Sequence, residues 1–149
     1  MYLDASLYIS GWEHTKEEEK SKYRAILELL DLQPFTTKIA PNMHVHITVG
    51  YWRKANQIHN WFVMNAQDGL DECQHAPVSI KQLDDLDELC RLVLEDHSKA
   101  AELLPTMSGF FFGGTDYDEY YFDDLKHTRN VIEKCRLMKD FSFIYHSCW

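Results

Sequence analysis

Two short stretches in which apolar and polar residues alternate constrain the fold more than any other feature. Residues 3–10 alternate Leu, Ala, Leu and Ile with polar neighbours, and residues 43–51 alternate Met, Val, Ile and Val with His, His and Thr. A period of two is typical of a strand that buries one face. Because helical patterns follow each stretch, the chain predicts a small sheet covered by helices.

Four segments show helical spacing, and start signals fix three of them. Thr15 with Glu18 forms a capping box, Ser79 with Gln82 forms another, and Thr115 with Asp118 starts the last helix. The second helix follows Gly50, and a short strand lies near the end of the chain. The predicted ranges are 15–30, 52–66, 79–94 and 115–135 for the helices and 141–145 for the last strand. We predict an α+β fold with three strands and about four helices, in the order β-α-β-α-α-α-β, as a single domain at 1–149.

The composition limits the class of protein. A chain of 149 residues with 45% hydrophobic residues is typical of one globular domain. Its longest apolar run is a few residues and no signal peptide is recognisable, so we expect a cytoplasmic protein without a membrane partner. The four cysteines lack CxxC spacing, which predicts reduced thiols that mostly fill the core.

The net charge of −9 argues against a protein that holds nucleic acid on an open basic face. We therefore predict no direct nucleic-acid partner. Enclosed recognition of a small nucleotide remains compatible with this charge, and so does docking of an acidic surface on a basic protein.

The first candidate site is the turn from a strand into a helix at 51–62. Arg53 and Lys54 are predicted to lie in the first helical turn, where the helix dipole favours anions. A bound phosphate or carboxylate would offset these cations. The alternative is that they form ion pairs with carboxylates of this acidic chain.

The same helix is predicted to carry a face suited to stacking a base or sugar. Trp52, Asn56, His59 and Val63 recur at helical spacing and share that face. An indole and a guanidinium can both stack on a base. The alternative is that these aromatic residues belong to the core, where Trp is usually found.

The second candidate site is the loop at 104–118, in which glycines flank three phenylalanines. Glycine permits close backbone approach, and exposed Phe111 or Tyr117 would need a ligand or partner to cover it. The alternative is that the phenylalanines plug the core. The acidic run that follows, from Asp116 to Asp124, complements a helix dipole, so no metal site is predicted.

A further candidate is His46, within His46-Ile47-Thr48. This element resembles the His-x-Thr motif of the two-histidine phosphoesterases, in which two motifs on adjacent strands supply the general base and acid. The second candidate motif, starting at His146, departs from the pattern because Cys148 stands where Ser or Thr belongs. The alternative is an ordinary strand histidine.

Longer motifs carry a resemblance that spans the chain from Val49 to its end. They are Tyr-Trp-Arg-Lys-Ala-Asn-x-Ile-His-x-Trp-Phe-Val at 51–63, Gln-Asp-Gly at 67–69, Leu-Leu-Pro-Thr-x-Ser-Gly-Phe-Phe-Phe-Gly at 103–113 and the final Trp149. These segments resemble a family of small bacteriophage and prophage proteins without a settled activity. The resemblance implies an accessory phage protein in the host cytoplasm, and it assigns no catalytic residues.

We therefore predict a non-enzymatic binding protein that encloses a small nucleotide-like or other anionic ligand, without cofactor or metal. One alternative is an acidic inhibitor of a host nucleic-acid-binding protein, for example a defence protein, and another is a phosphodiesterase using His46. A homo-oligomer is compatible with the sequence. The predicted ligand-binding residues are Tyr51, Trp52, Arg53, Lys54, Asn56, His59, Ser108, Phe111 and Tyr117.

Overall fold

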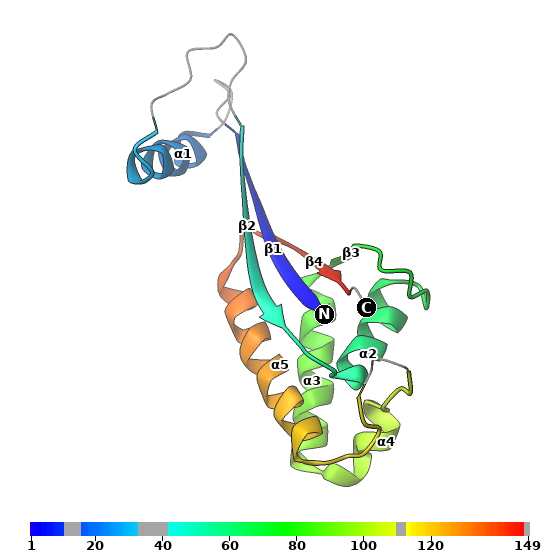
Figure 1. The fold of residues 1–149 in the computed structure, drawn as a ribbon. Helices are drawn as coiled ribbons and strands as arrows, with labels where there is room; N and C mark the ends of the chain where they lie inside the picture. The colour runs from blue at the N-terminus through cyan, green and yellow to red at the C-terminus, as the bar shows by residue number, and fades with distance from the viewer. Residues whose placement is uncertain (11–15, 33–41, 110–112, 148–149) are drawn as a thin grey trace. The chain divides into compact units, whose positions relative to one another are not determined.

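A computed structural model describes residues 1–10, 16–32, 42–109 and 113–147 (Figure 1). They form an α+β fold with a four-stranded antiparallel sheet in the order β2-β1-β4-β3. The elements are β1 (Tyr2–Ser10), α1 (Glu17–Leu29), β2 (Asn42–Tyr51), α2 (Asn56–Ala66), β3 (Ala76–Val78), α3 (Ile80–Glu95), the 3-10 helix η1 (His97–Lys99), α4 (Ala100–Leu103), α5 (Glu119–Leu137) and β4 (Ser142–His146).

The predicted α+β class is confirmed, whereas the predicted three strands and four helices are wrong in detail. The sequence missed β3 and α4, because three and four residues are too short to show a period. β3 lies at the edge of the sheet and pairs antiparallel with β4, with Pro77 opposite Ile144. An edge position tolerates Pro77, which has no N–H to donate.

The chain forms two compact units, one made of Met1–Ala5 with Ile47–Trp149 and the other of Ser6–His46. In the first unit, strands β1, β3 and β4 each turn alternate residues into a core. Helices α2, α3 and α5 contribute the rest of that core, and α3 packs along α5. The inward strand residues are Leu3, Ala5, Ala76, Val78, Phe143 and Tyr145.

The second unit contains α1 and the adjoining parts of β1 and β2. In α1 only Leu27 is buried, and three glutamates occupy its first turn. Its N-cap is Lys16, without a side-chain cap, and the predicted cap Thr15 lies outside the described residues. On the strands, Tyr8 packs edge-on against His44, and His44 stacks on His46.

Local signals fixed some helix ends correctly and others not. The capping box of Ser79 and Gln82 is present at the start of α3, as predicted. The helix α5 begins at Glu119 instead of near Thr115, because the Asp118 side chain accepts a hydrogen bond from the Tyr121 N–H and acts as the N-cap. The helix α2 begins at Asn56 instead of Trp52, which changes the candidate site.

Gly50 has a different role from the predicted one. β2 continues through it to Tyr51, so it makes no turn. A Cβ atom at Gly50 would lie 2.6 Å from the Trp52 ring and 2.9 Å from Val131. Glycine is needed here because the Trp52 indole packs against the backbone of the strand.

Candidate functional site

Asn56, the first residue of α2, joins the two segments that the sequence singled out. Its side chain is 2% exposed. Nδ2 donates to the Gly114 carbonyl at 2.8 Å, and Oδ1 accepts from the Met107 N–H at 2.9 Å. The Thr106 hydroxyl donates to the Thr115 carbonyl at 3.0 Å and ties the two arms of the loop together. The segments around 51–62 and 104–118 therefore meet in space.

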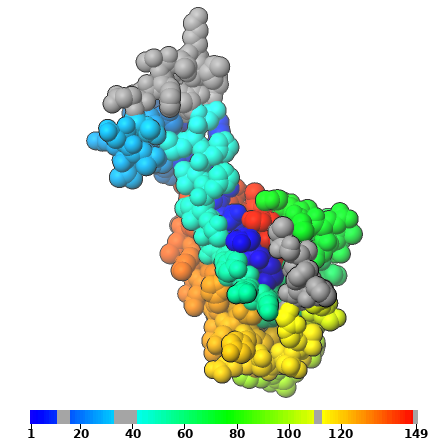
Figure 2. Space-filling model, in the orientation of Figure 1, coloured from blue at the N-terminus to red at the C-terminus, as the bar shows by residue number. Residues whose placement is uncertain are grey.

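Gly113 brings the loop against Lys54. Its φ of +82° lies in the left-handed region, and a Cβ atom there would be 3.1 Å from the Lys54 Cβ. Close approach and an unusual backbone angle both require glycine at this position. The space-filling view shows the end of β2 in contact with the yellow loop before α5 (Figure 2).

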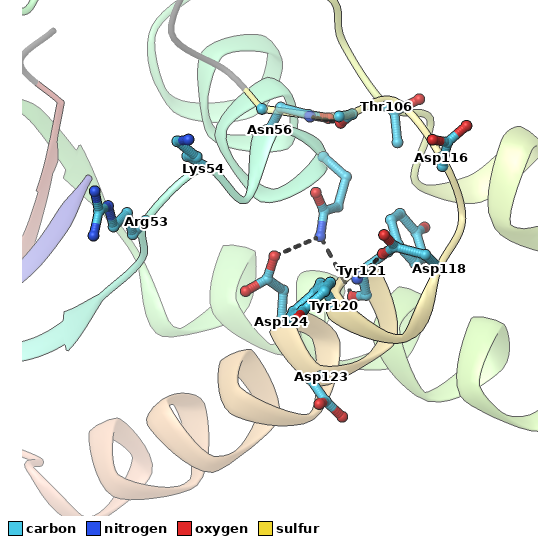
Figure 3. A pocket seen from close by; sticks show the side chains of 13 residues that line it. Arg53, Lys54, Asn56, Thr106, Asp116, Asp118, Tyr120, Tyr121, Asp123 and Asp124 are labelled. Atoms are coloured by element: carbon cyan, nitrogen blue, oxygen red, sulfur yellow. Dashed lines mark hydrogen bonds between the residues drawn. The ribbon is translucent and has the colours of Figure 1, made fainter.

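A cavity of about 350 Å³ lies beneath this contact, in the first compact unit. It is bounded by the turn before α2, the first turn of α2, the loop before α5 and the first turns of α5 (Figure 3). Its lining consists of Arg53, Lys54, Asn56, Gln57, Thr106, Gly113, Gly114, Asp116, Asp118, Tyr120, Tyr121, Asp123 and Asp124.

Arg53 and Lys54 lie at the rim, in the turn that precedes α2. The prediction that they occupy the first helical turn is wrong, since the N-cap is Ala55. Lys54 has φ +67°, a left-handed conformation that is uncommon outside glycine. Both side chains are exposed, and within the described part of the chain neither forms an ion pair. The alternative prediction, that they pair with the chain's own carboxylates, finds no support there.

Gln57 lies deeper and contributes an amide to the cavity. Its side chain is 3% exposed, and Nε2 donates to Asp124 Oδ2 at 3.3 Å and to the Tyr121 carbonyl at 3.5 Å. Its amide oxygen accepts no hydrogen bond from any described residue, and it is not sealed from solvent. A buried amide whose acceptor opens on a cavity is suited to a ligand hydrogen bond.

Asp124 is the most perturbed carboxyl of the cavity. Burial raises its pKa to about 6, and the hydrogen bond from Gln57 and the nearby His127 offset only part of that effect. Among the described residues no cation pairs with it. At neutral pH this side of the cavity therefore holds a partly desolvated negative charge that no cation among the described residues pairs with.

Other carboxylates of this wall are already engaged. Asp118 caps α5 through Oδ1, and Asp123 pairs with Lys126 at 2.8 Å. His127, on the same helix, donates through Nε2 to the Tyr51 carbonyl. No group of three potential metal-binding side chains occurs in the ranges that the structure describes.

The predicted stacking face of α2 is wrong. Trp52, Asn56, His59 and Val63 are all at most 5% exposed, so this face belongs to the core. Trp52 precedes the helix, donates through Nε1 to the Thr128 hydroxyl at 2.9 Å and packs against Phe62. Helical periodicity could not show this, because strand β4 and helix α5 cover the side that the pattern treats as open.

His59 forms part of a buried polar chain. Its Nδ1 lies 2.6 Å from the Tyr145 hydroxyl, and its Nε2 lies 3.1 Å from Asp71 Oδ2. Burial lowers the pKa of His59, and the hydrogen bond to Asp71 opposes the shift. A fully enclosed imidazole with partners on both sides holds α2 to β4 and to the loop after α2, and it does not line the cavity.

The other predicted residues that the structure describes are not part of the cavity lining. Tyr51 is 50% exposed and packs on Tyr2, and Ser108 is exposed in the loop. Tyr117 is 39% exposed and meets Tyr121 edge to face. Phe111 falls outside the described residues. Of the nine predicted residues, Arg53, Lys54 and Asn56 line the cavity.

Sequence reasoning missed Gln57, Thr106 and Asp124. Gln57 and Asp124 are polar residues on helix faces that turn inward. A polar residue at such a position needs a hydrogen-bond partner, so two of them that can pair could have been predicted to lie together. Thr106 gave no local signal.

The two histidines of the phosphoesterase alternative are separated in the sheet. His46 lies on β2 and His146 on β4, and β1 lies between these strands. The motif threonine, Thr48, donates to Asp4 at 2.7 Å, and His146 Nε2 lies 3.0 Å from the other Asp4 oxygen. Among the described strands, β2 and β4 are therefore not neighbours.

No family model, curated protein or solved structure matches this chain. Across the described residues, no helix combines the length and apolar character needed to cross a membrane.

Proposed function

We propose that the cavity binds a small ligand through an anionic group, such as the phosphate of a nucleotide, and that the protein acts by binding it. The observation that carries the proposal is the pair Arg53 and Lys54 at the rim. In a chain of net charge −9, two adjacent cations have no carboxylate partner among the described residues. An external anion would supply the missing charge.

The size and lining of the cavity support the proposal. About 350 Å³ falls within the range of small-molecule sites. Gln57 and Asn56 converge there from α2, and Asn56 fixes the loop through two hydrogen bonds. A loop held in this way presents polar groups without a large ordering cost on binding.

The proposal also includes a phage-related role, which rests on the sequence resemblance. The segments that resemble the phage and prophage family include both segments joined by Asn56, and the rim cations lie within the first of them. We therefore propose an accessory role in a phage-infected host cell.

The acidic-inhibitor alternative has less support. A mimic of nucleic acid needs a row of free carboxylates, whereas Asp118 caps a helix, Asp123 pairs with Lys126 and Asp124 is partly buried.

Binding can be tested by NMR titration and thermal shift. The panel is inorganic phosphate, mononucleotides, cyclic dinucleotides and ADP-ribose, with the amides of Asn56 and Gly114 as reporters. We expect at least one phosphate-bearing compound to bind and to stabilise the native state, since only that state has the cavity. Arg53→Ala should weaken binding about tenfold or more, the loss expected for one charge-assisted hydrogen bond.

Two further variants separate binding from folding. Lys54→Gly removes the second cation and relieves its left-handed backbone, so affinity should fall while stability is kept or improved. Lys139→Ala removes an exposed cation outside the cavity lining and should leave affinity unchanged. Absence of binding across the panel, or equal losses in Arg53→Ala and Lys139→Ala, would contradict the proposed function.

A further inference from the structure

Away from the rim cations, the side chains that line the cavity offer more hydrogen-bond acceptors than free donors. Both described donor contacts of the Gln57 amide are internal, and the Thr106 hydroxyl donates to the loop. The Tyr121 hydroxyl donates to the Leu104 carbonyl, which leaves the exposed Tyr120 hydroxyl as a donor. Among these side chains the Gln57 oxygen and the carboxylates are therefore the acceptors offered to a ligand, and the Tyr120 hydroxyl is the free donor.

This surface is also negatively charged. Figure 3 shows Arg53 and Lys54 on one side of the cavity and Asp116 and Asp118 on the other, with Asp124 between them. Among the described residues Asp116 and Asp124 form no ion pair. The cavity is thus dipolar, cationic at one end and anionic at the other.

Gln57 adds a nearly buried amide to this acidic wall. It lines the cavity, it is 3% exposed, its N–H groups are committed to Asp124 and the Tyr121 carbonyl, and its oxygen accepts no hydrogen bond from a described residue. A ligand N–H could donate to this oxygen in place of solvent. A ligand donor placed beside Asp124 would satisfy both groups at once.

We propose that the wall formed by Gln57 and Asp124 receives a protonated amine, so that the ligand of this cavity is a dipolar molecule with an anionic group at one end and an amine at the other. The inference rests on the proposed function, because it assigns the second end of a ligand whose anionic group lies at Arg53 and Lys54. A charged amine fits better than a hydroxyl, since it supplies both the donor and the charge that Asp124 lacks.

The charged surroundings of Asp124 give the pH dependence. From α5 it faces Asp123 and His127, from the preceding loop Asp118, and from α2 the neutral Gln57. Burial raises its pKa to about 6, so at pH 5 most of the carboxyl is protonated and offers less to a cation. The advantage of an amine over a hydroxyl should therefore shrink between pH 7.5 and pH 5.

The test compares 3-aminopropyl phosphate with 3-hydroxypropyl phosphate, and the same pair with five carbons. Each pair has one phosphate and one length, and differs only in the amine. NMR titration at pH 7.5 should show the amine probe binding about tenfold tighter, the gain expected for one charged pair. The ratio of the two affinities should fall at pH 5. Both probes carry a phosphate, so the effect of its titration on binding cancels in this ratio.

Two variants locate the effect. Asp124→Asn keeps the size of the side chain and should bring the two probes to equal affinity while phosphate binding persists. Glu133→Gln removes one charge from the same helix outside the cavity and should keep the preference. Equal binding of both probes by the unaltered protein, or an unchanged preference in Asp124→Asn, would overturn the inference and leave the proposed function standing.

The remaining outcomes are also decisive. Binding of 3-aminopropanol as tightly as 3-aminopropyl phosphate would overturn the dipolar ligand. Failure of every phosphate-bearing probe, nucleotides included, would remove the proposed function and this inference with it.

Discussion

The two stretches of sequence that contain the candidate sites, 49–64 and 103–128, have different roles in the structure. The first places Trp52, Trp61 and Phe62 in the core and gives the cavity two rim cations and the amides of Asn56 and Gln57. The second supplies much of the cavity wall through a loop and the carboxylates at the start of α5. In this chain the aromatic residues therefore indicate the core, and the charged residues beside them indicate the candidate cavity.

The two sides also differ in how their charges are treated. Arg53 and Lys54 are exposed, and their charges cost little to keep without a partner. Asp124 is partly buried, and its charge is costly enough to raise its pKa to about 6. Under the proposed function, a ligand that joined both sides would gain more at the acidic wall than at the rim, because desolvated charges interact more strongly.

Among the residues of the first segment, Trp52 should contribute most to stability. Trp52→Ala should lower the free energy of unfolding by about 3–5 kcal/mol, because it leaves a cavity and removes the indole N–H that donates to the Thr128 hydroxyl. The neighbouring Tyr51→Ala, at a half-exposed position, should cost less than about 1 kcal/mol. Urea denaturation of both variants measures this, and similar losses would contradict the assignment of Trp52 to the core.

The junction between the segments depends on Asn56. Asn56→Ala should cost about 2–3 kcal/mol, because it leaves the Met107 N–H and the Gly114 carbonyl without their partner. Amide exchange at Met107 should accelerate far more than exchange in α3. Asn60→Ala, one turn further along α2, serves as the control and should leave exchange at Met107 unchanged.

Substitution in the acidic wall should change the free energy of unfolding least, and should increase it instead of lowering it. The pKa of Asp124 is raised on folding from 3.8 to about 6, so its contribution to stability is full below pH 4 and is lost as the pH rises through 6. Asp124→Asn should therefore increase the free energy of unfolding at pH 7.5 by about 1–2 kcal/mol, after allowance for solvent screening.

Denaturation at a series of pH values checks this prediction. The variant should lose the fall in stability between pH 4 and pH 7 that Asp124 contributes, while Glu133→Gln keeps it. A variant less stable than the parent protein at pH 7.5 would show that Asp124 is favourably paired.

Sequence reasoning succeeded where the signal was local. Period-two patterns located β1 and β2, and the box of Ser79 and Gln82 located the start of α3. It failed at α2, where Trp52 fits the helical period but lies outside the helix. It also failed at His59, because a periodic face does not reveal whether strand β4 covers it.

The sequence by itself determined the α+β class, the main helices and strands, and the presence of two cations beside an aromatic segment, since each follows from the order of neighbouring residues. Only the tertiary structure decided that Asn56 joins the two segments and that Gln57 meets Asp124. These contacts link residues more than fifty positions apart, and packing of α2 against α5 sets them. The site is therefore a property of that packing.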